Sequence, residues 1–516
     1  MSTTTPPKGR NLPLVHVIYP RIGGRGLHET QAFRYRPYML FILGALARRE
    51  GWRVRLIDEN NPRTLPPPDE RPDLVAVTVW TRFAPRAYQI CQTWRARGVL
   101  TVVGGVHPSI AVSEALRYAD AVVAGEAESV IAEVLNDALA GNLKRVYRGE
   151  WLEMDVVPHA RDFADLAAQR AFWGAPLQSY QSTRGCRYNC EFCSVIRINR
   201  RGQRHIPPER VVEELRIISK LPPRLPIRTP VYFHDDDMAS DPEYLASLCE
   251  AMIRAKLKIT WSAQVSIALA RNEELLDLAT RAGLDSVFIG FESMSRESLV
   301  EANKKNRPHE YAELIARLHS RRVNVRGGIV LGFDHDGPDV FEQTAEAAHR
   351  IGIDVMHATI LTPLPGTGTF ARMYDEGRIV DFNWENYDVY HAVFEPARMS
   401  RQQLAEGLVT TYQAFYGKSR RLQRLLRGLR YQRPVTYASS VMTNALYGRA
   451  YRGPVPPSTT EFWADPADVE EIAAASRADA NAAINVAIDL ATGNSRAGSP
   501  DSRTRTPVVF RAARPA

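Results

Sequence analysis

Eight residues in the middle of the chain decide its fold, and they read Cys186-Arg187-Tyr188-Asn189-Cys190-Glu191-Phe192-Cys193. This loop holds three of the five cysteines in a chain of 516 residues. Three thiolates on one short loop can bind three irons of a 4Fe-4S cluster and leave the fourth iron open to another ligand. The spacing therefore predicts an iron-sulfur cluster held by Cys186, Cys190 and Cys193.

Two other interpretations fit these cysteines less well. A structural zinc site needs a fourth ligand, yet Cys91 and Cys249 lie far from the loop in apolar helical patterns typical of buried side chains. A disulfide framework is typical of small secreted domains with an even number of cysteines, whereas this chain is long and has five.

The spacing and the loop context resemble the radical S-adenosylmethionine (SAM) superfamily. Phe192 also matches an aromatic residue that packs near the adenine of SAM in that family. The resemblance implies that the open iron binds the amino and carboxylate groups of SAM. It further implies that an electron from the cluster cleaves the sulfonium to give a 5'-deoxyadenosyl radical.

Overall composition is that of a soluble globular protein, with 45% hydrophobic and 24% charged residues. The length suggests roughly two to four domains. Neither a signal peptide nor a membrane span is recognisable, so we expect a cytoplasmic protein. The formal net charge is +8, but basic residues are scattered among acidic ones, and we expect a small-molecule substrate and no nucleic acid.

Apolar runs alternate with helical patterns over residues 1–150. This alternation predicts an α/β domain with a doubly wound, Rossmann-like parallel sheet, which binds ligands at the carboxyl ends of its strands. The expected strands cover residues 14–18, 54–57, 74–78, 100–103 and 121–123, and helices are expected at 38–49 and 84–97.

Small residues follow three of these strands, where glycine lets the backbone approach a ligand, although turn geometry alone also explains them. In their order along the chain, these strand ends and the run 102–109 resemble the cobalamin-binding domain that precedes the radical SAM barrel in one large subgroup. The resemblance implies that cobalamin contacts Thr78, Gly104, Gly105, Gly125 and Glu126.

One departure from other cobalamin enzymes concerns the metal ligand. The motif Asp-x-His-x-x-Gly, which supplies a histidine to cobalt, is missing after the first strand, where residues 20–26 form a glycine-rich loop. We therefore expect cobalt to lack a histidine from that loop, which could face the corrin or be flexible. His107 is expected to form a hydrogen bond or lie at the surface rather than bind cobalt.

Residues 151–177 have no clear periodicity and are expected to be a linker. Over residues 178–390 strands and helices alternate again, with strands expected at 180–185, 231–233, 259–262, 286–290, 328–332 and 356–360. Six strands match the partial (β/α)6 barrel implied by the resemblance, with chemistry at the carboxyl ends of the strands. By position in that family, the expected SAM contacts are Asp236, Asp237, Gln264, Ser266, Glu292, Gly328 and Gly332.

Two further segments complete the chain. A basic run of Arg197, Arg200, Arg201 and Arg204 could bind an anion or be a solvated loop. Ser400 to Gln403 has the form of a capping box before a helical pattern, so residues 391–470 are expected to form a helical extension that caps the barrel mouth. Residues 471–516 are expected to be largely disordered, above all beyond Ser495.

A cobalamin domain before a radical SAM barrel implies that both cofactors share one substrate cavity. The favoured function is a C-methyltransferase that acts on an unactivated carbon of a small metabolite through a 5'-deoxyadenosyl radical and methylcobalamin. A radical oxidative cyclase or ring-rearranging enzyme uses the same parts, and a non-catalytic cobalamin or redox sensor stays open. A tRNA methylthiotransferase would need extra cluster cysteines and an RNA-binding domain. The expected electron donor is a flavodoxin or ferredoxin.

Overall fold

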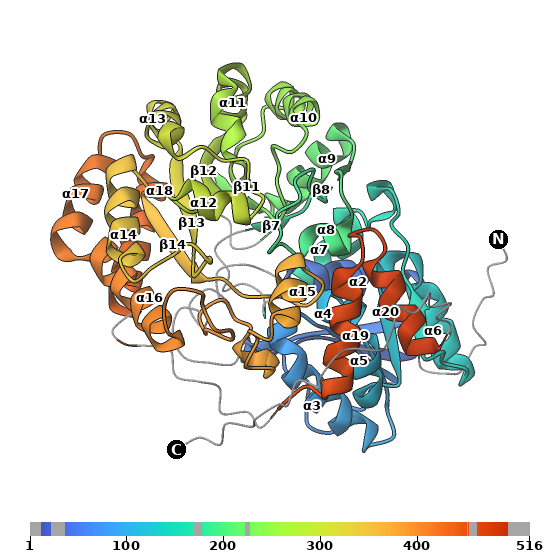
Figure 1. The fold of residues 1–516 in the computed structure, drawn as a ribbon. Coiled ribbons are helices and arrows are strands. Elements are labelled where there is room, and N and C mark those ends of the chain that lie inside the picture. The colour runs from blue at the N-terminus through green and yellow to red at the C-terminus, as the bar shows by residue number, and fades with distance from the viewer. Residues whose placement is uncertain are drawn as a thin grey trace.

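A computed structural model of the chain describes residues 12–21, 37–169, 171, 178–221, 228–450, 453 and 462–493. Two six-stranded parallel sheets dominate the fold (Figure 1). The first is built from residues 14–148 and the second from residues 178–360. Helices after residue 400 pack against both parts, so the end of the described chain returns to its beginning.

The first sheet has the strand order β2-β1-β3-β4-β5-β6. Its order reverses between β1 and β3, which is the point where such sheets bind ligands at the carboxyl ends of the strands. The predicted doubly wound domain is confirmed, and β6 is a strand that the sequence did not predict. The strands are β1 (Leu14–Tyr19), β2 (Arg53–Asp58), β3 (Leu74–Thr78), β4 (Leu100–Gly104), β5 (Ala121–Ala124) and β6 (Val146–Arg148), and the helices are α2 (Tyr38–Arg49), α3 (Ala84–Arg95), α4 (Val106–Ile110), α5 (Val112–Tyr118) and α6 (Ile131–Ala140).

The second sheet has the order β14-β13-β12-β11-β10-β7, and all its neighbours are parallel. Because each strand neighbours the next one in sequence, the sheet curls into the predicted open six-stranded barrel. Its strands are β7 (Gln178–Tyr180), β10 (Thr229–Phe233), β11 (Ile259–Val265), β12 (Leu284–Glu292), β13 (Asn324–Leu331) and β14 (Val355–Ile360). Its helices are α8 (Val195–Asn199), α9 (Pro208–Ile218), α10 (Pro242–Arg254), α11 (Glu273–Arg281), α12 (Arg296–Glu301), α13 (Tyr311–Ser320), α14 (Val340–Ile351) and α15 (Gly368–Asp375).

The expected linker contains a helix, α7 (Ala160–Ala167), which packs between α2 and α9. His159 and Asp162 form a capping box at its start. Phe163 and Leu166 are buried, so the segment belongs to the core that joins the two sheets rather than to a flexible connection.

The helical extension begins as predicted, because the Ser400 hydroxyl accepts a hydrogen bond from the Gln403 amide and the Gln403 side-chain oxygen accepts one from the Ser400 amide. The Tyr412 hydroxyl bonds the backbone of Ala358, so the first helix covers the outer edge of β14. Near the start of this helix, Leu404 packs beside Gly332 at the carboxyl end of β13. That the extension caps the barrel mouth stays a prediction. The helices are α16 (Arg401–Tyr416), α17 (Lys418–Gly428) and α18 (Pro434–Ala450).

The expectation of disorder from residue 471 is wrong for the part described. Helices α19 (Pro466–Arg477) and α20 (Ala483–Thr492) pack on α4 and α5 of the first domain. Arg117 of α5 forms ion pairs with Asp465 and Asp468 at 3.0 and 2.5 Å. Helix α19 also packs on α15 of the barrel. Local composition missed these helices because their short apolar stripes are buried only against segments distant in sequence. The remainder of that expectation, residues 494–516, and most of the loop at 20–26 lie outside the described residues.

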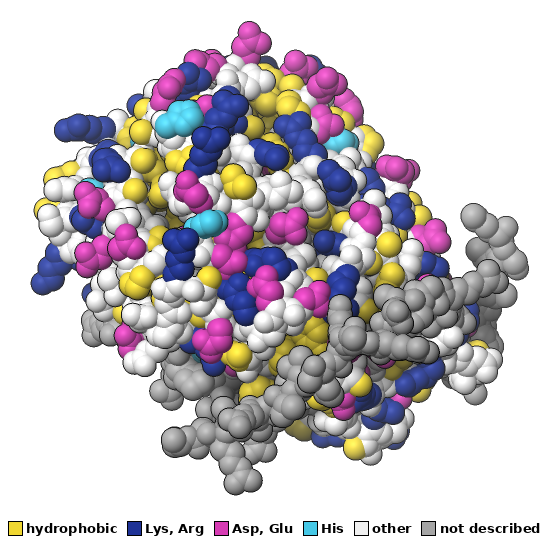
Figure 2. All heavy atoms as spheres, in the orientation of Figure 1, with side chains coloured by type: hydrophobic (Ala, Val, Ile, Leu, Met, Phe, Trp, Pro, Cys, Tyr) yellow, Lys and Arg dark blue, Asp and Glu magenta, His cyan; other side chains and the backbone are white. Residues whose placement is uncertain are grey.

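The surface is mixed in charge. On the face shown in Figure 2, Lys and Arg side chains are interspersed with Asp and Glu, in agreement with their scatter along the sequence. Among the described helices, none is long and apolar enough to span a membrane.

Candidate functional site

The cysteine loop follows β7 at the carboxyl edge of the barrel sheet. It is framed by a two-stranded antiparallel sheet of β8 (Thr183–Arg184) and β9 (Arg204–His205). Gly185 stands directly before Cys186 with φ of +94°, and a Cβ there would lie 2.3 Å from the Gly202 carbonyl oxygen. Only glycine fits this close approach, so the sequence Gly-Cys is required by the fold of the loop.

Backbone hydrogen bonds hold the loop at both sides. Asn303 donates through Nδ2 to the Asn189 carbonyl at 2.8 Å, and the Glu191 amide donates to Ala302 at 3.2 Å. The Glu191 carbonyl accepts from the amide of Thr369, in the first turn of α15, at 3.2 Å. The loop is thus fixed between α12 and α15 before any ligand binds.

The three thiols lie in one shielded environment. Burial, with a smaller contribution from the charge of Cys190, raises the pKa of Cys186 to about 11 and that of Cys193 to about 12. The thiols are therefore close enough to sense one another's charge. Cys190 is buried and Cys186 and Cys193 are partly exposed, and three sulfur ligands on one fixed loop fit a 4Fe-4S cluster.

The run of aspartates after β10 supports this loop. Asp236 accepts hydrogen bonds from the Gly185 amide at 2.8 Å and the Asn199 amide group at 3.0 Å. Its neighbour Asp235 is fully buried and accepts from Ser182, and burial raises the pKa of Asp235 to about 6. Asp236, which was predicted to contact SAM, is therefore also a support of the cluster loop.

Asp237 lies beside another residue that was predicted to contact SAM. One of its oxygens accepts the Ser266 amide at 2.9 Å, so Asp237 and Ser266 are brought together, while the Gln264 side chain lies on the accessible inner face of β11. Burial raises the pKa of Asp237, although the nearby ammonium of Lys304 opposes the shift. These residues and the cysteines surround the same end of the barrel.

Lys304 is a site residue that sequence reasoning missed. Its ammonium lies 3.0 Å from Glu292 and feels the charges of Cys190 and Asp237, which raise its pKa against the effect of burial. Glu292 has a φ of +63°, rare for a residue with a side chain, and Gly290 leaves room for its carboxylate. In the sequence Lys304 stands in a polar turn beside Lys305, so nothing local distinguished it from a surface lysine.

Gly328 in β13 and Gly332 just after it let neighbouring side chains pack closely against the backbone. A Cβ on Gly328 would lie 2.9 Å from the Phe288 ring, and one on Gly332, at φ of +98°, would lie 2.8 Å from Leu404. Asp336 accepts the amides of Gly332 and Phe333 and orders the turn that follows. Phe192 meets Phe333 edge to face, with ring centroids 6.5 Å apart.

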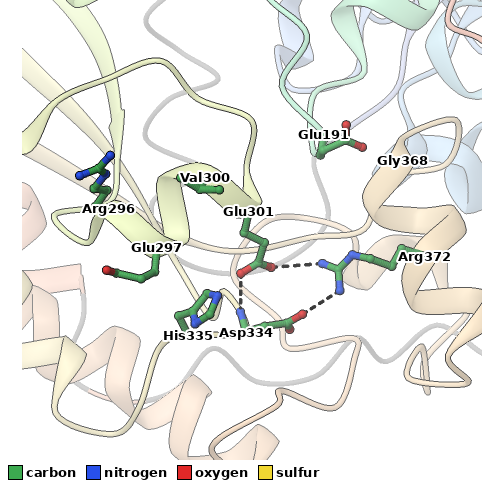
Figure 3. A pocket seen from close by; sticks show the side chains of 9 residues that line it. All are labelled: Glu191, Arg296, Glu297, Val300, Glu301, Asp334, His335, Gly368 and Arg372. Atoms are coloured by element: carbon green, nitrogen blue, oxygen red, sulfur yellow. Dashed lines mark hydrogen bonds and ion pairs between the residues drawn. The ribbon is translucent and has the colours of Figure 1, made fainter.

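An open cavity of about 650 Å³ lies beside the cluster loop (Figure 3). Arg372 of α15 binds Asp334 at 2.7 Å and Glu301 at 3.1 Å, and Figure 3 shows these three side chains converging. Glu191, which lies between two cysteines of the loop, lines the same cavity. The cavity thus connects the surface with the backbone of the cluster loop.

The carboxyl edge of the first sheet, where such sheets bind ligands, is accessible after β3, β4 and β5. Thr78, Gly104, Gly105 and Gly125 are partly exposed, and Thr78 pairs with Gly104 in the strand register. Gly105 and Gly125 have φ of +115° and +101°. A Cβ at these two positions would lie 2.8 and 2.2 Å from backbone oxygens, so both glycines are required by the turns. Accessible backbone at this edge fits a large cofactor such as cobalamin.

Glu126 reaches across to the barrel. It binds Arg204 through both oxygens, at 2.5 and 2.9 Å, and lies 3.5 Å from Arg184. Arg184 in turn binds Glu128 at 2.5 Å. Of the basic run, Arg204 is therefore paired within the protein. Arg197 donates to the Ala478 carbonyl at 2.6 Å, and the Arg200 guanidinium lies 3.7 Å from the centre of the Trp151 ring.

His107 is buried and forms the hydrogen bond that was expected. Its Nε2 lies 2.9 Å from Glu114, which also accepts from the Tyr88 hydroxyl at 2.7 Å. The other oxygen of Glu114 accepts the Trp384 indole N–H at 2.8 Å. Trp384 follows the barrel in sequence, so this buried cluster is a second contact between the two parts of the chain.

Comparison with known proteins matches both halves. Residues 24–135 match the B12 binding domain, and residues 180–348 match the radical SAM superfamily. Bacteriochlorophyllide d C-12(1)-methyltransferase of Chlorobaculum tepidum is 31% identical over 391 residues, which cover 75% of this chain and 84% of that protein. Hopanoid C-2 methylase of Rhodopseudomonas palustris is 26% identical, covering 67% of this chain and 65% of that protein.

Solved structures show the same fold. The radical SAM methyltransferase TsrM from Kitasatospora setae, with cobalamin and a 4Fe-4S cluster bound, superposes with a TM-score of 0.59 at 13% identity and covers 94% of this chain and all of that one. The cobalamin-dependent radical enzyme OxsB with aqua-cobalamin bound gives 0.60 at 14% identity, covering 84% and 72% of the two chains.

Proposed function

Because the chain belongs to the radical SAM enzymes that carry an N-terminal cobalamin-binding domain, we propose that it methylates an unactivated carbon of a small molecule. The cofactors of this family are a 4Fe-4S cluster, SAM and cobalamin. Relatives named as methyltransferases act on bacteriochlorophyllide d and on hopanoids. Their shared feature is methylation of a cyclic compound, and we infer the same class of reaction for this chain.

A single observation carries this proposal: the ligand edge of the first sheet is joined to the cluster loop of the second. Glu126 and Glu128 follow β5, and they bind Arg204 and Arg184, which frame that loop. The turn at Gly366 also meets Ile110 of α4, since a Cβ on Gly366 would lie 3.0 Å from the Ile110 side chain. A substrate between the two edges would therefore face both cofactors.

We propose Cys186, Cys190 and Cys193 as the cluster ligands. For SAM we propose Asp237, Gln264, Ser266, Glu292, Gly328, Gly332 and Phe192, with Asp236 acting through the loop that it supports. For cobalamin we propose Thr78, Gly104, Gly105 and Gly125, and Glu126 is the residue that holds their edge to the barrel. Lys304 is added as the buried cation next to Cys190 and Glu292.

When bound, the cluster and SAM supply a 5'-deoxyadenosyl radical, and cobalamin supplies the methyl group. The chain itself positions these groups and excludes water from them. Buried side chains exclude the water, because Trp384, His107 and Glu114 close one side of the boundary between the two sheets. Reduction of the cluster requires an outside donor, and we propose that a flavodoxin or ferredoxin approaches the cavity that contains Glu191.

A radical cyclase is the second candidate. The anaerobic magnesium-protoporphyrin IX monomethyl ester cyclase of Rubrivivax gelatinosus is 23% identical over 67% of this chain and 66% of that protein. The residues at the cluster loop serve either reaction, since both begin with removal of a hydrogen atom.

Anaerobic incubation of the reconstituted protein with cobalamin, a reductant and methyl-labelled SAM tests the proposal. Mass spectrometry should find both 5'-deoxyadenosine and label on cobalamin. Deoxyadenosine without label on cobalamin would favour the cyclase. Intact SAM would contradict both enzymes and support a cobalamin or redox sensor.

A further inference from the structure

Three side chains stand next to one another on the inner face of the barrel sheet. In the strand register Gln264 pairs with Phe288, and Phe288 pairs with Arg326. Paired residues point to the same face, because successive side chains of a strand alternate between faces. All three are partly exposed. The side chains on the opposite face at the preceding positions, Ala263, Val287 and Val325, are completely buried.

Helix α18 closes the base of this inner face. Asn324, at the start of β13, donates to the Ser440 hydroxyl at 3.0 Å, and Asn444 donates to the Asp354 carbonyl, just before β14, at 3.2 Å. These contacts all lie at the amino ends of the strands. The accessible surface therefore lies between this base and the opposite end of the strands, where the cluster loop stands.

Aromatic rings form one wall of the enclosed face. Gly328 lets the Phe288 ring lie against the sheet, since any Cβ there would meet the ring at 2.9 Å. The His357 ring stands edge-on to Phe288, with centroids 6.3 Å apart. Its two nitrogens lie 3.0 Å from the Tyr390 hydroxyl and 3.4 Å from the Tyr447 hydroxyl. Four separate segments of the chain thus bring rings together at this face.

Arg326 supplies the charge of this face. Within the described part of the chain, no carboxylate lies within 4.0 Å of its guanidinium, which donates only to the Ser439 hydroxyl at 3.4 Å. The neighbouring Asp285 is engaged elsewhere, by Arg433 at 3.5 Å and by Thr436. Burial raises the pKa of Asp285 and the charge of Arg326 opposes this shift, so Arg326 has a carboxylate nearby but none in direct contact. A carboxylate that accepts two of its N–H groups would replace the solvation that the half-buried guanidinium has lost.

We propose that the substrate is a planar conjugated molecule that bears a carboxylate, with the carboxylate bound by Arg326 and the ring system lying against Phe288 and His357. This inference rests on the proposed function, since it describes the molecule on which that function acts. Arg326 stands five residues before the end of β13 at Leu331, about 16 Å along the strand. The anion is therefore the end of the substrate farthest from the cluster loop, and it is not the carboxylate of SAM.

Binding of pheophorbide a and of its methyl ester tests this, because the two differ only in the free carboxylate. Both would be titrated into the anaerobic reconstituted holoenzyme while ligand fluorescence is followed. We expect Arg326→Gln to weaken binding of the acid roughly tenfold or more and binding of the ester less than about twofold. Arg326→Lys should recover part of the loss, because it keeps the charge without the two-pronged geometry.

Arg350→Gln is the matched control, since Arg350 is an exposed arginine of α14 on the outer side of the barrel. It should bind both ligands as the unchanged protein does, and circular dichroism should show that every variant is folded. Equal binding of acid and ester, equal loss of both in Arg326→Gln, or no binding of either would overturn the inference. SAM cleavage by the unchanged protein is measured in the same samples, so a failure of the proposed function is seen separately from a failure of ligand binding.

Discussion

Glu126 and Arg204 form a two-pronged ion pair across the boundary between the two sheets, with distances of 2.5 and 2.9 Å. Glu126 follows a strand of the cobalamin-binding domain, and Arg204 closes the frame of the cluster loop. The pair is 7% and 17% exposed at the side chains, so water screens it little. It therefore holds the carboxyl edges of the two sheets, where we propose that cobalamin and the iron-sulfur cluster bind, in one relative position.

Replacing Glu126 by Gln should destabilise the protein by about 3 kcal/mol, because it leaves the Arg204 charge partly buried without a partner. Urea unfolding measures this loss, and cobalamin retention on a desalting column should fall with it. Glu133→Gln is the control, since Glu133 pairs with Lys144 at the surface of the same domain. A Glu126 variant as stable as this control would contradict a holding role for the pair.

Replacing Cys186, Cys190 and Cys193 together by Ala should remove the iron and abolish SAM cleavage. Cobalamin binding should persist, because the residues that we propose for it lie on the other sheet. Iron content, product analysis and the cobalamin absorption spectrum check the three expectations. Cys249→Ala should keep its iron, since Cys249 is buried in α10 away from the loop. Persisting SAM cleavage in the triple variant would overturn the assignment of the cluster ligands.

Gly125→Ala should cost about 3 kcal/mol or more of unfolding free energy. Its φ of +101° strains any side chain, and the added Cβ would lie 2.2 Å from the Gly149 carbonyl oxygen. Gly141→Ala isolates the backbone strain, because Gly141 has φ of +71° with nothing within 4 Å of a Cβ. We expect about 1 kcal/mol there. Similar losses in the two variants would show that the close contact at Gly125 is relieved by movement.

Asp235 should make stability depend on pH. Burial raises its pKa from 3.8 to about 6, so the folded protein binds this proton more tightly than the unfolded chain does. The contribution of the group is complete below about pH 4 and is lost as the pH rises through about 6, a change of up to about 3 kcal/mol. Urea unfolding between pH 4 and 8 should show this slope in the natural protein and not in Asp235→Asn. Parallel pH profiles would contradict the raised pKa.

Periodicity predicted most of the fold. The strands of both sheets are found where apolar runs predicted them, because a parallel strand buried on both faces needs a continuous apolar run. The exceptions are short or depend on distant partners. Strand β6 has three residues, and α19 and α20 are buried against α4 and α5 of the cobalamin-binding domain and against α15 and α8 of the barrel, all of them distant in sequence. None of these three elements has an apolar periodicity strong enough to be distinguished from a loop by sequence alone.

Some residues of the candidate site could be predicted from the sequence and others could not. Cys186, Cys190 and Cys193 were evident because their spacing lies within eight residues. Glu126 was placed at the correct strand end, but its partner Arg204 is 78 residues away and could not be identified from either segment. Lys304 was missed for the same reason, since a lysine in a polar turn becomes a buried cation only through the burial of the turn against the loop.

The sequence by itself determined the cluster loop, the two parallel sheets and the class of cofactors, because these depend on spacing and periodicity within short segments. Tertiary structure alone decided which charges are paired. It joins Arg204 to Glu126, joins Lys304 to Glu292, and leaves Arg326 on the inner face of the barrel with no carboxylate of the described residues within 4.0 Å. The physical reason is that the free energy of a charge depends on its burial and its neighbours, which the path of the whole chain sets.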